Sequence, residues 1–163
     1  MTLSDLLTFF DIIVTALVGI YIATSIQNNF AKKRALKDYF ISELTVLLSD
    51  YRHFVNEIWS AKLNSKSVKD TFKVLSGRID SLDRFLHENF TLEQSLIKDA
   101  HVKFQQEATG VDELGDQYNN EFLTLKPETK ARLMPYHNEL ADAITRRVID
   151  INQAKLKKKK CRK

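Results

Sequence analysis

The sequence predicts an all-α protein, and three features carry that prediction. Apolar residues recur every three or four positions through four long stretches, which is the spacing of one face of an α-helix. The chain has only four glycines and two prolines, whereas an all-β fold needs frequent turn residues. One further stretch, residues 6–26, is apolar almost without interruption.

Residues 6–26 read LLTFFDIIVTALVGIYIATSI, and Asp11 is their only charged side chain. A helix of this length, rising about 1.5 Å per residue, spans about 30 Å, which is the thickness of a bilayer's hydrocarbon core. A cleaved signal peptide has a basic start and a shorter apolar core, whereas Asp5 precedes this run. We therefore expect one transmembrane helix at residues 6–26, after a short extracytoplasmic N-terminus at residues 1–5.

The cost of burying Asp11 does not overturn this expectation. The Leu, Ile, Phe and Val residues of the run contribute about −4 to −7 kcal/mol to insertion, against about +2.5 to +3.5 kcal/mol for one Asp at the bilayer centre. Asp11 also lies near the first end of the run, where headgroups and water lower its cost.

Basic residues set the expected orientation. Lys32, Lys33, Arg34 and Lys37 follow the run, and no Lys or Arg precedes it. The positive-inside rule then places the N-terminus outside and the rest of the chain in the cytoplasm, at the plasma or inner membrane. The lone cysteine, Cys161, excludes an intramolecular disulfide and fits a reduced compartment.

Asp11, Thr15, Gly19 and Ala23 recur every four residues and share one face of the expected membrane helix. Small side chains at this spacing let a second helix approach closely, and a polar group in lipid gains from a partner. This pattern predicts a helix-packing face, for a homo-oligomer or for a different membrane subunit. An ion or proton pathway built on Asp11 is the alternative.

The rest of the chain predicts an antiparallel four-helix bundle with up-down-up-down topology over residues 27–156. The first helix continues from the membrane helix to about residue 62, and the others cover about residues 67–89, 92–122 and 127 or 135 to 158. Ser65 or Ser67 is expected to cap the second helix. Thr91 and Gln94 have capping-box spacing at the start of the third helix.

The last seven residues, 157–163, carry most of the basic character. They read KKKKCRK, and without their six charges the chain has 19 Lys and Arg against 21 Asp and Glu. The up-down topology returns this tail to the cytoplasmic membrane face, where anionic headgroups attract basic side chains. We expect a membrane-surface role for Lys157, Lys158, Lys159, Lys160, Arg162 and Lys163, with a disordered solubilising end as the alternative. Nucleic acid is not expected, because no aromatic residues alternate with the basic ones.

No pattern of catalytic or metal-binding residues stands out. A di-metal bundle site needs two Glu-x-x-His pairs, and the chain offers only the imperfect half formed by Asp50 and His53. No nucleophile motif and no phosphate-binding glycine loop is present in the sequence. We therefore expect no enzymatic activity, metal, cofactor or small-molecule substrate.

Arg132 and His137 are separated by four residues, and this spacing resembles that of the helical ribonucleases of the HEPN family. That family usually has a polar residue after the Arg, where this chain has Leu133, and Pro135 interrupts the helix that would present the pair. These departures argue against carrying the family's activity over to this chain.

The sequence as a whole favours a non-enzymatic, single-pass membrane protein. Its cytoplasmic bundle would act as an accessory or scaffold subunit that assembles through its transmembrane and bundle helix faces. The alternative is a membrane-permeabilising or channel-forming effector whose transmembrane helices associate around Asp11.

Overall fold

The computed structural model describes residues 3–92 and 96–155, with side chains from Leu17 onward except that of Asn29. The regular structure of these residues consists of helices, which confirms the all-α class. Their bounds are α1 Leu3–Trp59, α2 Ser65–Asn89, α3 Leu96–Thr109, α4 Asp112–Asp116 and α5 Pro127–Gln153.

The chain divides into two compact units, and α1 contributes residues to both. Unit 1 comprises Met1–Asp38 and unit 2 comprises Tyr39–Lys163. The boundaries expected after residues 5, 26 and 156 are finer than this division and stay predictions.

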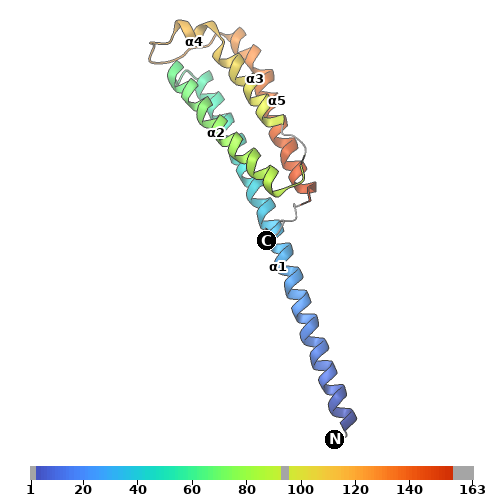
Figure 1. Ribbon diagram of the computed structural model, residues 1–163. Coiled ribbons are helices and arrows are strands. Elements are labelled where there is room, and N and C mark those ends of the chain that lie inside the picture. The colour runs from blue at the N-terminus through green and yellow to red at the C-terminus, as the bar shows by residue number, and fades with distance from the viewer. Residues whose placement is uncertain (1–2, 93–95, 156–163) are drawn as a thin grey trace, which may run out of the picture. The chain divides into compact units, whose positions relative to one another are not determined.

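Unit 2 is a four-helix bundle formed by α2, α3, α5 and the part of α1 from Tyr39 onward (Figure 1). The ring of Phe54 packs on that of Phe72 at 4.9 Å, and Phe40 packs on Phe90 at 5.7 Å, so α1 and α2 run antiparallel. Figure 1 shows α3 and α5 reversing direction in turn. The expected bundle is therefore confirmed for unit 2.

Helical periodicity predicted the core of the bundle well. The apolar residues that recur every three or four positions are all buried on α2, and most of those on α1 and α5 are buried too. They are Phe40, Leu44, Leu47, Tyr51, Phe54, Ile58, Val68, Phe72, Leu75, Ile79, Leu82, Leu86, Leu133, Leu140, Ile144 and Ile151. Fully burying one large apolar side chain stabilises a fold by about 1.5–3 kcal/mol, so these stripes hold the helices together.

The turn between α1 and α2 combines two capping motifs. Lys62 N–H donates to Glu57 O at 2.9 Å, and Ala61 N–H donates to Ile58 O at 3.2 Å, which is the Schellman pattern of a helix end. Ala61 takes the left-handed conformation that this pattern requires, with φ of 50°. Asn64 then caps α2 by accepting from Ser67 N–H at 2.7 Å, so the expected Ser65 or Ser67 cap was wrong.

The expectation of one helix over residues 92–122 was also wrong. The structure has α3 and the short α4 instead, followed by an irregular segment up to α5. Gly110 ends α3, and Leu96, Tyr118 and Phe122 are exposed rather than inward-facing. The proposed capping-box partner Gln94 lies outside the described residues.

The irregular segment before α5 is tied to the bundle. Gln117 forms two hydrogen bonds with the backbone of Thr124, at 2.8 and 2.9 Å. Leu123 N–H donates to Leu63 O at 2.7 Å, and the side chains of Leu123 and Leu125 are buried. A helix that continued through this segment would leave the side chains of Leu123 and Leu125 less buried.

A buried carboxylate caps the start of α5. Glu113 accepts from the Thr129 hydroxyl at 2.6 Å, and this hydrogen bond lowers the pKa of the Glu113 carboxyl. A negative group at a helix N-terminus is stabilising. The helix α5 begins at Pro127, the first of the two expected starts, and Pro135 lies inside it. It ends at Gln153, before the expected residue 158.

The left-handed residue at the α1–α2 turn generates a stability prediction. Ala61→Gly should raise the free energy of unfolding by about 0.5–1 kcal/mol, because glycine has no Cβ to clash at positive φ. Urea unfolding of the purified chain measures the change. Ala131→Gly, at an exposed helical position of α5, is the matched control and should lose about 1 kcal/mol. Destabilisation by Ala61→Gly would contradict the capping assignment.

Candidate functional site

An uncovered apolar segment of α1, residues 17–26, is the first candidate site. Large apolar side chains project from most of the helix circumference, apart from the face of Gly19 and Ala23, and 49–73% of the surface of each is exposed. They are Leu17, Val18, Ile20, Tyr21, Ile22 and Ile26. Contiguous exposed apolar surface of this kind marks a candidate interaction site.

Among the residues that the structure describes, no helix has an apolar stretch long enough to cross a membrane. Within the expected span at residues 6–26, side chains are described only from Leu17 onward. Asp11 and Thr15 lie outside the described side chains. The transmembrane helix therefore stays a prediction.

The described half of the expected packing face consists of Gly19 and Ala23. Both are exposed, and a Cβ added to Gly19 would meet no atom within 4 Å. On the neighbouring turn, the Thr24 hydroxyl lies within hydrogen-bond distance of Ile20 O at 2.9 Å and Tyr21 O at 3.0 Å. A polar side chain satisfied within its own helix needs no water, so this surface is compatible with an apolar environment.

A basic collar, defined as Lys32, Lys33, Arg34 and Lys37, follows the uncovered segment on α1. Lys32, Lys33 and Arg34 are exposed and Lys37 is half-buried. Arg34 makes only a long, exposed ion pair to Asp38 at 3.9 Å, which contributes little in water. The exposed Lys32, Lys33 and Arg34 therefore place positive charge on the surface of α1. The basic residues of the tail, from Lys157 to Lys163, lie outside the described residues.

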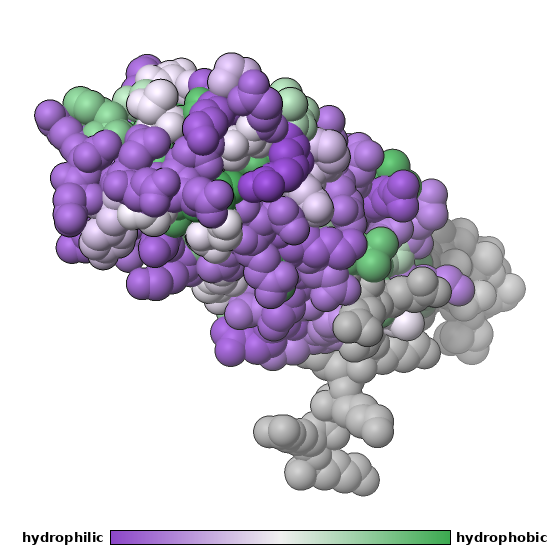
Figure 2. Space-filling view, turned by 90° about the horizontal axis from the view of Figure 1, so that it is seen from above, coloured by the Kyte–Doolittle hydropathy of each residue, from purple (hydrophilic) through white to green (hydrophobic). Residues whose placement is uncertain are grey.

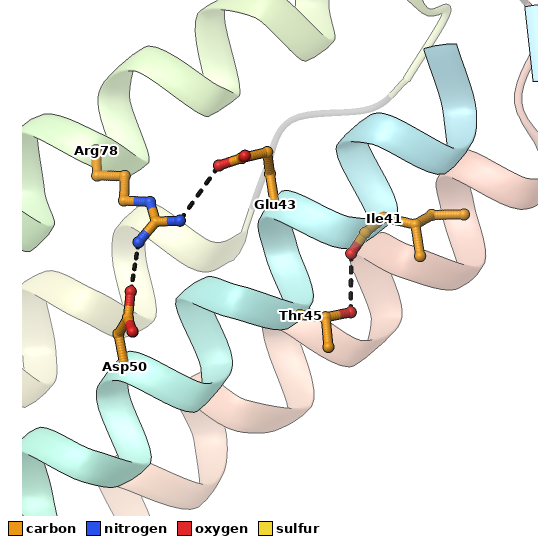
Figure 3. A network of polar contacts seen from close by, with 5 residues as sticks. All are labelled: Ile41, Glu43, Thr45, Asp50 and Arg78. Atoms are coloured by element: carbon orange, nitrogen blue, oxygen red, sulfur yellow. Dashed lines mark hydrogen bonds and ion pairs between the residues drawn. The ribbon is translucent and has the colours of Figure 1, made fainter. Parts of the chain in front are cut away.

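Glu43, Asp50 and Glu57 recur every seven residues on α1 and form an acidic row, and two of its members tie α1 to α2. Arg78 of α2 donates to Glu43 at 3.2 Å and also to Asp50, as Figure 3 shows. Glu57, the next member of the row, pairs with His53 at 3.3 Å. No group of three or more His, Cys, Asp or Glu side chains in the described part of the chain is arranged to hold a metal ion.

Three polar side chains from three helices meet in the core of unit 2. His101 of α3 is 1% exposed; its Nδ1 hydrogen-bonds the hydroxyl of Tyr51 on α1, and its Nε2 lies 2.6 Å from Oγ of Ser76 on α2. Ser76 in turn donates to Phe72 O at 2.8 Å. Sequence reasoning missed this cluster, because its members are 25 and 50 residues apart.

Hydrogen-bond directions determine what the cluster can do. The single Ser76 proton goes to the Phe72 carbonyl, so Ser76 accepts from Nε2–H of His101. Nδ1 must then accept from the Tyr51 hydroxyl, whose pKa is raised by burial. In this tautomer His101 cannot take a proton from Ser76, so the cluster is not an activated nucleophile.

His137 lies apart from that cluster, against the rings of Trp59 and Phe104 at 6.5 and 6.1 Å. Neither of its ring nitrogens has a hydrogen-bond partner of normal geometry among the described residues. Burial lowers the pKa of its imidazole and outweighs the neighbouring Asn138 side chain, which favours the protonated ring. Arg132 is exposed to solvent instead. The described geometry therefore gives no support to a nuclease-like pairing of these two residues.

A groove of about 860 Å³ runs between α3 and α5. Ala100 and Ala143 form its floor, and three basic and three acidic side chains surround it, among them the ion pair of Lys103 and Glu139 at 2.7 Å. The balanced charge gives no preference for a polyanion such as nucleic acid. Seen from above in Figure 2, the surface is mostly hydrophilic, with separate apolar patches.

No protein-family model, no curated protein and no solved structure matches this chain.

Proposed function

We propose that this chain is a single-pass, membrane-anchored scaffold or accessory subunit. Its N-terminal helix spans the bilayer, its bundle lies in the cytoplasm, and it assembles with itself or with a membrane partner through its helix faces. The observation that carries this proposal is the uncovered apolar segment of α1 at residues 17–26.

Lipid suits this segment better than a single protein partner does. A docked protein covers one face of a helix, whereas these large apolar side chains occupy more than one face. Removing each large one from water is worth about 1.5–3 kcal/mol. The sequence continues the apolar run back to residue 6, which gives the length that a bilayer requires.

The basic collar supports the orientation with the bundle in the cytoplasm. It directly follows the apolar run, and the residues before that run include no Lys or Arg. Anionic lipids of the cytoplasmic leaflet attract such a cluster by about 1 kcal/mol per basic residue. The partners proposed for the collar and the tail are therefore anionic headgroups.

Assembly rests on the face containing Asp11, Thr15, Gly19 and Ala23. The exposed Gly19 surface leaves room for another helix to approach the backbone, because no atom of this chain lies where a Cβ would sit. The core of unit 2 contains no activated nucleophile at Ser76.

Charging the uncovered segment should release the chain from membranes. Ile20→Arg combined with Ile22→Arg adds about 5–7 kcal/mol to the cost of insertion. We expect the doubly substituted chain to move from the carbonate-resistant membrane fraction to the soluble fraction. Cell fractionation with immunoblotting measures the distribution.

Val74→Arg combined with Phe85→Arg is the matched control for membrane release. These two apolar side chains of α2 are 71% and 46% exposed, compared with 61% and 50% for Ile20 and Ile22. The control should stay in the membrane fraction. Equal behaviour of the two double variants, or a soluble unsubstituted chain, would contradict membrane anchoring.

Enlarging the small residues should weaken assembly. Gly19→Leu combined with Ala23→Leu should raise the dissociation constant of the assembly about tenfold, because bulky side chains keep the helix backbones apart. Energy transfer between donor-labelled and acceptor-labelled chains in liposomes measures self-association, and copurification in mild detergent measures a different partner.

Val18→Leu combined with Ile22→Leu, at neighbouring positions outside the small-residue face, is the control and should leave assembly unchanged. A strictly monomeric chain with no copurifying partner would contradict the proposed role.

A further inference from the structure

We propose that the cluster of Tyr51, His101 and Ser76 is a pH-sensitive joint that holds α3 against α1 and α2 and loosens in acid. This inference concerns the bundle alone and does not depend on the membrane anchor. It rests on the direction of three consecutive hydrogen bonds in a buried site.

The three hydrogen bonds all run the same way. The Tyr51 hydroxyl donates to His101 Nδ1, His101 Nε2–H donates to Ser76, and the Ser76 hydroxyl donates to the Phe72 carbonyl. Each donor has an acceptor and each acceptor has a donor, so neutral His101 is fully satisfied. This arrangement requires one tautomer, with the proton on Nε2.

A second proton on His101 is incompatible with this series of three hydrogen bonds. Protonated Nδ1–H would face the Tyr51 hydroxyl, which would have to turn its own proton elsewhere. Tyr51 is completely buried, so that proton would have no water to bond. An unsatisfied buried donor and an unpaired buried charge both destabilise the joint.

The groups around His101 offer little compensation. Asp80 on α2 favours the protonated ring, but burial outweighs it, so the pKa of His101 is lowered overall. On α1 the facing titratable group is Tyr51, and on α3 the amide of Gln105 lies 3.5 Å from Ser76. On α5 the titratable His137 is two rings away, through Phe104 and Phe72.

The sign of the pH effect follows from the lowered pKa. The unfolded chain binds a proton at its ordinary pKa of about 6.5, and the folded chain binds it only at lower pH. Stability is therefore fully present above about pH 6.5 and falls as the pH drops from there to the folded pKa. Within that window each such histidine changes the folding equilibrium constant by up to about tenfold per pH unit.

Urea unfolding of the full chain in detergent, followed by the fluorescence of its single tryptophan, tests the effect. The folding equilibrium constant should be flat between pH 8 and 7 and should fall below pH 6.5. His137 has a lowered pKa too, so two variants separate the contributions. His101→Gln should lose less stability below pH 6.5 than the unsubstituted chain does, because the contribution of His101 is gone. His137→Gln should keep the part of the stability loss that comes from His101. A fall in His101→Gln as steep as in the unsubstituted chain would overturn the proposal.

Nuclear magnetic resonance of the folded chain with labelled histidines provides a second test that does not need a stable His101 variant. His101 should carry its proton on Nε2 at pH 7.5 and should titrate below 6.5. A proton on Nδ1 at pH 7.5, or titration of His101 at its ordinary pKa, would refute the joint.

Discussion

The need to remove apolar side chains from water governs both parts of this chain. In unit 2 the inward stripes of α1, α2, α3 and α5 cover one another, and side chains such as Leu44, Phe72 and Ile144 are almost fully buried. In unit 1 the large apolar side chains of residues 17–26 remain exposed on α1. The hydrophobic effect that folds the bundle also favours covering this exposed segment, and a bilayer is the covering that we propose.

Polar groups in the bundle decide which helices meet and in what register. The buried guanidinium of Arg147 on α5 forms an ion pair with the Asp83 carboxylate on α2 at 3.3 Å. Glu113 on α4 caps the start of α5. His101 joins α1, α2 and α3 through hydrogen bonds that suit only its neutral form. Apolar stripes alone tolerate sliding, whereas an unmet buried polar group carries a penalty of about 1–3 kcal/mol. The register is thereby restricted.

Local patterns predicted what depends on local sequence. The spacing of apolar residues predicted the all-α class, the buried residues of α2 and the helical bundle, because each helix of the bundle buries one face. The expectation of one helix over residues 92–122 underrated the local signal of Gly110, where α3 ends. The irregular segment that buries Leu123 and Leu125 was missed because its hydrogen bond to Leu63 joins residues distant in the chain. The cluster around His101 was missed for the same reason: sequence spacing does not reveal which helices are neighbours. Of the expected membrane-packing face, only Gly19 and Ala23 lie among the described side chains.

Accessibility of single thiols to a membrane-impermeant maleimide tests the proposed anchor most directly. Tyr21→Cys and Ala35→Cys, each combined with Cys161→Ser, place one thiol in the uncovered segment and one in the basic collar region. In inside-out membrane vesicles the account predicts that the Ala35→Cys thiol reacts, and that the Tyr21→Cys thiol is protected until detergent is added. Equal reaction of the two thiols in intact vesicles would contradict a membrane-spanning α1.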